Sequence, residues 1–352
     1  MRGILLAILF SAAPCGAAEP ILGFNFPVWW HDAYGSPRAV AAYGEMAGMG
    51  AGWVAIIPTL YTADRKSDEV AVTDGTASDG SLRLAIRLAH AQGLKVLLKP
   101  HVDMANAGGP RSLLNPSDAA LWFKSYGGHI ERYAVLAAEE RCEMFAVGTE
   151  LAQLTEPQHT AAWRALIARV RKAFPGPLTY AANWHSVAVP LFWKDLDYIG
   201  VDGYFPLPGG SSGPALDAAW RPWALELRAL SKLWGRPILF TEIGIAAQTG
   251  ANLKPWAWDD FGPLDQNLQA VYMESFLRTF GNETWVAGFF YWAWEADAAK
   301  TGPLDKSMSV QGKPAEQVLR RAFARSKAAP LPFGWRERLE DLASRLSGVR
   351  LF

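Results

Sequence analysis

Two glutamates in this sequence stand directly after short apolar runs. Glu150 ends the segment 147–150, and Glu242 lies within the segment 240–244. Either residue alone could be a helix-capping neighbour or a salt-bridge partner, so the pair is the informative feature. Two carboxyl groups can cleave a glycosidic bond when one is protonated and the other is ionised. The pair Glu150 and Glu242 therefore suggests cleavage of a glycosidic bond.

The elements that must position these glutamates are eight short apolar runs separated by helical patterns. The runs cover residues 21–26, 53–57, 94–98, 144–147, 178–182, 198–201, 238–240 and 286–291. Helical spacing marks 38–49, 81–92, 116–139, 159–173, 215–234 and 266–280. Continuous rather than alternating runs are typical of parallel strands buried on both faces. We therefore predict an α/β fold, a single (β/α)8 TIM barrel over residues 19–325.

A barrel of this kind places its active site at the C-terminal ends of its strands. Both glutamates should then face each other at the mouth. Six further residues at strand ends are predicted to contact substrate: Trp29, Lys99, His101, Asn183, Tyr204 and Trp292. We expect Tyr204 to hydrogen-bond Glu242 and Trp292 to form the floor under the cleaved sugar. For each of them, structural packing is the alternative.

Composition narrows the possible partners. The chain has 16 Trp residues, and indole rings can form stacking platforms for sugars. A formal net charge of +0 gives no sign of a nucleic-acid partner. Fragments such as His31-Asp32 lack convincing metal-ligand spacing, and neither a serine nucleophile elbow nor a phosphate-binding loop is found. We therefore expect a polysaccharide or oligosaccharide substrate, no metal and no cofactor.

The two ends of the chain differ from the barrel pattern. Residues 1–18 combine an early positive charge, a short apolar run and small residues, which is typical of a secretory signal peptide. This predicts a secreted or periplasmic protein, and Pro14 before Cys15 disfavours a lipid anchor. The apolar run is too short to span a bilayer. Residues 326–352 are predicted to form an amphipathic tail helix that packs on the barrel or contacts a partner or membrane surface.

Four segments resemble glycoside hydrolase family 113, known for β-1,4-mannanases. They are residues 23–25, 147–150, 241–244 and 291–294, within a resemblance that covers roughly 21–320. The resemblance implies a mannan-like substrate and a double displacement, with Glu150 as acid/base and Glu242 as nucleophile. Thr149 departs from the wider clan of retaining barrel glycosidases, many of which have Asn before the acid/base. Another β-glycan or an exopolysaccharide is the alternative substrate, and a non-catalytic carbohydrate-binding barrel or a scaffold is the alternative function. Endo or exo action and the oligomeric state stay open.

Overall fold

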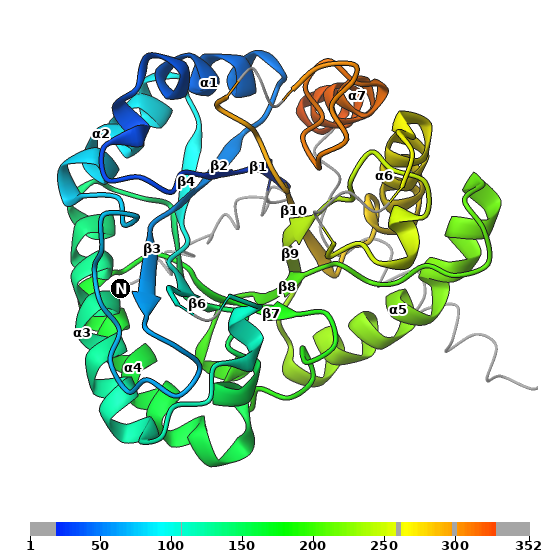
Figure 1. Ribbon diagram of the computed structural model, residues 1–352. Helices are drawn as coiled ribbons and strands as arrows, with labels where there is room; N and C mark the ends of the chain where they lie inside the picture. The colour runs from blue at the N-terminus through cyan, green and yellow to red at the C-terminus, as the bar shows by residue number, and fades with distance from the viewer. Residues whose placement is uncertain (1–18, 107, 258–261, 298–300, 329–352) are drawn as a thin grey trace, which may run out of the picture.

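The protein is a closed barrel of parallel strands surrounded by helices (Figure 1). The computed structural model describes residues 19–106, 108–257, 262–297 and 301–328. Around the barrel the strands run in the order β1-β10-β9-β8-β7-β6-β4-β2. They are β1 Ile21–Pro27, β2 Trp53–Ile57, β4 Lys95–Leu98, β6 Met144–Thr149, β7 Leu178–Asn183, β8 Ile199–Asp202, β9 Ile238–Ile243 and β10 Val286–Tyr291. These are the eight predicted runs, and the (β/α)8 barrel is confirmed.

The helices form the outer layer of the barrel (Figure 1). They are α1 Pro37–Gly48, α2 Asp79–Ala91, α3 Ala119–Glu139, α4 Thr160–Ala173, α5 Gly213–Trp234, α6 Gln266–Phe280 and α7 Pro314–Ala328. The short 3-10 turns are η1 Ala33–Gly35, η2 Arg111–Leu113, η3 Ala152–Thr155, η4 Pro157–His159, η5 Trp193–Asp195 and η6 Ala251–Leu253. Side chains of Ser36, Ser78 and Asp118 accept hydrogen bonds from the first turns of α1, α2 and α3, which fixes where these helices begin.

Six of these helices were predicted from the sequence, and α7 was not. Helix α7 is the last helix of the described residues, and it packs against α6. The predicted signal peptide at 1–18 lies outside the described residues, as does the predicted tail helix beyond residue 328. Among the described residues, no helix combines the length and apolar character needed to cross a membrane.

A second, two-stranded sheet extends beyond the C-terminal ends of two neighbouring barrel strands. Pro58 and Pro100 follow β2 and β4, and the chain then continues as β3 Thr59–Thr62 and β5 His101–Met104. These strands pair in parallel, with Thr59 opposite His101. Proline has no N–H to donate to a strand ladder, which accounts for the break between each barrel strand and its extension. The extension places His101 and Asp103 above the rim of the barrel.

The barrel interior changes from apolar to polar along its axis. One buried cluster inside the strands contains Ile21, Trp53, Ala55, Leu97, Met144, Ala146, Leu239 and Phe290. Strands β1 and β10 approach each other closely beside this cluster: a Cβ at Gly288 would lie only 1.9 Å from the Ile21 carbonyl oxygen. At the C-terminal ends of the strands the buried side chains are instead polar, including Asn25, Lys99, Thr149, Asp202, Thr241 and Glu242. Buried polar groups of this kind need partners, and their partners define the candidate site.

Candidate active site

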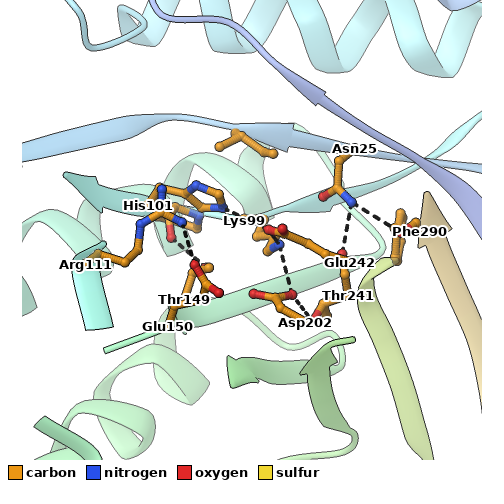
Figure 2. Close-up of polar contacts among 12 residues, drawn as sticks. Asn25, Lys99, His101, Arg111, Thr149, Glu150, Asp202, Thr241, Glu242 and Phe290 are labelled. Carbon is orange, nitrogen blue, oxygen red and sulfur yellow. Dashed lines mark hydrogen bonds and ion pairs between the residues drawn. The ribbon is translucent and has the colours of Figure 1, made fainter. Parts of the chain in front are cut away.

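Glu242, near the end of β9, is almost fully buried and accepts hydrogen bonds on both carboxylate oxygens. The Lys99 ammonium donates to Oε1, and the Tyr204 hydroxyl donates to Oε2 at 2.6 Å. Figure 2 shows Lys99 next to Glu242. His101 Nε2 lies 3.8 Å from Oε1. The hydrogen bond expected from Tyr204 is therefore present. Each oxygen of this carboxyl group therefore has its own donor, and one of the two donors is charged.

Lys99 lies beneath Glu242 and is fully buried. Its Nζ also lies 3.4 Å from Asp202 Oδ1, which accepts a further hydrogen bond from the Thr241 hydroxyl at 2.7 Å. Lys99, which was predicted to contact substrate, has its ammonium on two carboxyl groups and no exposed surface in this structure. Burial raises the pKa of Asp202 well above its usual range, and the neighbouring Glu242 charge adds to the rise. Because Thr241 and Lys99 both donate to its Oδ1, Asp202 is a buried acceptor within the site.

The backbone beside each glutamate is tied to a neighbouring strand. The Asn25 amide on β1 donates to the Thr241 carbonyl at 3.0 Å, next to Glu242. The Thr149 hydroxyl donates to the Pro100 carbonyl at 3.1 Å, next to Glu150. Thr149 therefore uses its side chain to fix the end of β6. These ties limit the movement of both carboxyl groups, which is what a reaction with strict geometry requires.

Glu150 follows β6 in an unusual backbone conformation, with φ of 55°. Its N–H donates to the Ala181 carbonyl at 2.7 Å. Asn183 Nδ2 donates to Glu150 Oε1 at 2.5 Å, and Arg111 Nη1 donates to Oε2 at 3.3 Å. Burial raises the pKa of Glu150 to about 7, against the lowering effect of Arg111 and with a further rise from the Glu242 charge. Near neutral pH this carboxyl group can therefore both give and take a proton.

Arg111 is a site residue that the sequence analysis missed. It lies in η2, and its Nε and Nη2 donate to Asp103 Oδ1 on β5 at 3.0 and 2.7 Å. Figure 2 shows it beside His101, directed toward the glutamates. The residue does not follow a barrel strand and belongs to no periodic pattern. Only its charge, a few residues after the strand-end segment, could have indicated it.

The remaining predicted residues divide into those that surround the glutamates and one that does not contact them. His101 is buried and stacks on Trp292, with ring centroids 6.0 Å apart and planes at 9°. Burial, followed by the charges of Arg111 and Lys99, lowers the pKa of His101 well below its usual range, which keeps the ring neutral. Trp292 also lies 5.8 Å from the Lys99 ammonium, which faces its ring. Trp29 is 53 % exposed after β1 and belongs to none of these contacts.

An aromatic cluster borders the site on the side of Asn183. Trp184, the next residue, stacks on Trp256 with centroids 5.7 Å apart and planes at 18°. Trp223 and Phe205 contact Trp184 from the following elements. Nearly half of Trp256 is exposed. Among the described residues no cluster of three or more His, Cys, Asp or Glu side chains could hold a metal ion.

Two carboxyl groups with different hydrogen-bond donors at the mouth of a (β/α)8 barrel are the arrangement of a barrel glycoside hydrolase. The model of Glycoside Hydrolase Family 113 matches residues 25–313, and the chain belongs to this family. Among proteins with curated descriptions, none matches the sequence.

Solved structures agree with this assignment. A GH113 β-1,4-mannanase is 29% identical with a TM-score of 0.79, covering 87% of this chain and 99% of its own. The GH113 β-mannanase AaManA from Alicyclobacillus acidocaldarius, solved in complex with ManMIm, is 30% identical with a TM-score of 0.79, covering 87% and 98%. A β-glucuronidase from Ruminococcus gnavus, 16% identical with a TM-score of 0.58 over 86% of this chain and 50% of its own, shares the fold.

Proposed function

We propose that this glycoside hydrolase cleaves β-1,4-mannan or manno-oligosaccharides with retention of configuration, using Glu150 as acid/base and Glu242 as nucleophile. The observation that carries the proposal is the contrast between the two carboxyl groups. Glu242 receives donors from Lys99 and Tyr204 on its two oxygens, whereas burial raises the pKa of Glu150 to about 7. A carboxyl group whose pKa lies near neutrality suits the acid/base, and one held by a donor on each oxygen suits the nucleophile.

The reaction follows in two steps from these roles. In the first, protonated Glu150 gives its proton to the glycosidic oxygen as the C–O bond breaks, and a Glu242 oxygen bonds to the anomeric carbon. In the second, ionised Glu150 takes a proton from water, and that water oxygen displaces Glu242 from the sugar. Lys99 and Tyr204 hold the Glu242 carboxylate in place before the first step and receive it again after the second.

The substrate assignment rests on the family. The two GH113 structures described above are β-mannanases, and their chains are covered almost completely by the likeness. Exposed aromatic surface at Trp256 and the stacked Trp292 suit the flat faces of sugar rings. Another β-glycan or an exopolysaccharide is the second candidate. The contrasting surroundings of Glu150 and Glu242 favour catalysis over a silent carbohydrate-binding barrel.

The substrate and stereochemistry are tested together. The purified protein is incubated with β-1,4-mannan, β-1,4-glucan, xylan and their oligosaccharides, and new reducing ends are followed by time-resolved NMR. We expect mannan to be cleaved fastest and the first product to be the β-anomer. A double displacement needs carboxyl groups about 5–5.5 Å apart, which leaves no room for a water under the sugar. An initial α-anomer would rule out the nucleophile role of Glu242. Faster cleavage of glucan or xylan would overturn only the substrate.

We also propose that the protein is exported, which suits a polymeric substrate. The motivation is the charged, apolar and small-residue pattern of segment 1–18. When the full gene is expressed in a bacterial host with a Sec pathway, mass spectrometry should find a mature chain that begins at Glu19. Leu6→Arg, which places a charge in the apolar run, should leave the precursor uncleaved in the cytoplasm. An intact Met1 on wild-type protein outside the cytoplasm would contradict cleavage.

A further inference from the structure

We propose that Arg111 and Asp103 act as one charge-balancing pair that positions Glu150 and sets how readily it changes between acid and base. The inference rests on the proposed acid/base role of Glu150. The double displacement itself uses neither residue, yet the pair lies directly against the carboxyl group (Figure 2 shows Arg111 beside Glu150). Arg111 is therefore a positioning residue.

Different nitrogen atoms of the Arg111 guanidinium contact Asp103 and Glu150. Nε and Nη2 both donate to Asp103 Oδ1, so the guanidinium is fixed on the two-stranded sheet of β3 and β5. Nη1 alone reaches Glu150 Oε2, at 3.3 Å. A planar guanidinium can hold both contacts because its donors have fixed directions, whereas an ammonium cannot reproduce them. Asn183 donates to the other oxygen, Oε1, so both oxygens of the Glu150 carboxyl group have a donor.

The pair suits the two opposed demands on Glu150. Its protonated form is needed for the first step and its ionised form for the second. Burial favours the protonated form, and Arg111 is the largest charge acting the other way on the pKa of Glu150. Asp103 partly cancels Arg111 and so raises that pKa slightly. A full cation without Asp103 would favour the ionised form more strongly, and no cation at all would favour the protonated one.

Other charged or titratable groups around Glu150 are already committed. Those that act on Glu150 are Lys99 after β4, Asp103 on β5, Tyr180 on β7, Asp202 on β8, Tyr204 after β8 and Glu242 on β9. Tyr61 on β3 and His101 on β5 face Arg111 instead. Lys99 is bound to Glu242 and Asp202, and His101 is neutral. Tyr204 donates to Glu242. Within the described residues, the Arg111–Asp103 pair contacts Glu150 through Arg111 Nη1, and it reaches Glu242 only through the longer-range charge of Arg111.

The test compares two variants whose effects should have opposite signs. The alkaline limb of kcat/KM reports the acid in the free enzyme. In Arg111→Gln, loss of the cation favours protonated Glu150, and the limb should move up by about one pH unit. In Asp103→Asn, Arg111 is no longer neutralised, and the limb should move down by a smaller amount. Arg111→Lys keeps the charge and loses the fork, so its limb should return toward wild type while kcat stays reduced.

A structural role alone would lower activity in both variants without opposite shifts, and that result would overturn the proposal. Thermal unfolding checks that each variant is folded. Failure of the proposed hydrolase reaction is distinguished by titrating Glu150 directly, through the carboxyl signal of 13C-Glu protein that disappears in Glu150→Gln. If the pKa read from that signal moves in opposite directions in Arg111→Gln and Asp103→Asn, the result supports the proposed role of the pair even without turnover. Equal or absent shifts reject it.

Discussion

Glu242→Ala should abolish mannan hydrolysis, by at least about four orders of magnitude in kcat, while the barrel stays folded. The variant removes the atom that bonds to the anomeric carbon, and Lys99 and Tyr204 then lose their shared partner. Lys99 retains Asp202, which limits the cost of leaving a buried ammonium. Steady-state kinetics gives the loss of turnover, and circular dichroism with thermal unfolding gives the state of the fold.

Azide provides the diagnostic control for this variant. With an activated aryl mannoside, the anion can enter the vacated space beside Lys99 and form a bond to the anomeric carbon as aryl oxide leaves. The product should be a glycosyl azide of inverted configuration, and wild-type enzyme should not form it. A folded Glu242→Ala variant with near wild-type turnover, or a rescued product of retained configuration, would contradict the assignment of Glu242.

Glu150→Gln should lower turnover of natural mannan by about 10²–10⁴-fold, because a sugar leaving group needs a proton. An activated aryl mannoside should lose much less in its first step, since its leaving group departs unprotonated. Glutamine keeps the size of the side chain and an oxygen that can accept from Asn183 or Arg111. Pre-steady-state bursts separate the two steps. Equal and severe losses of the first step with both substrates would exclude the acid role.

The barrel could be predicted because its signals are local and repeated. Each strand is a continuous apolar run, and parallel strands that close into a barrel bring their C-terminal ends together. This rule predicts Glu150 and Glu242 at the mouth, and the structure has them at the ends of β6 and β9. Helix α7 was not predicted although Val318, Leu319 and Phe323 on it are buried, because these few apolar residues stand among many charged ones.

The details of the site depend on tertiary closure and were less predictable. Lys99 directly follows β4, and sequence position alone could not say whether its side chain would rise to the mouth or lie under Glu242. Asp202 was equally open, and its contacts make it an acceptor for Thr241 and Lys99. Arg111 reaches the site only because Pro58 and Pro100 begin an extra pair of strands, one of which carries Asp103.

The left-handed backbone at Glu150 has a consequence for engineering this protein. A side chain at φ of 55° costs about 1–2 kcal/mol that glycine would not. A search for thermostable sequences that considers the fold alone would therefore favour glycine at position 150 and delete the acid/base carboxyl group. The change that would relieve this backbone strain and a change that would remove the acid/base carboxyl group coincide at a single residue, so position 150 has to be held fixed in any such design.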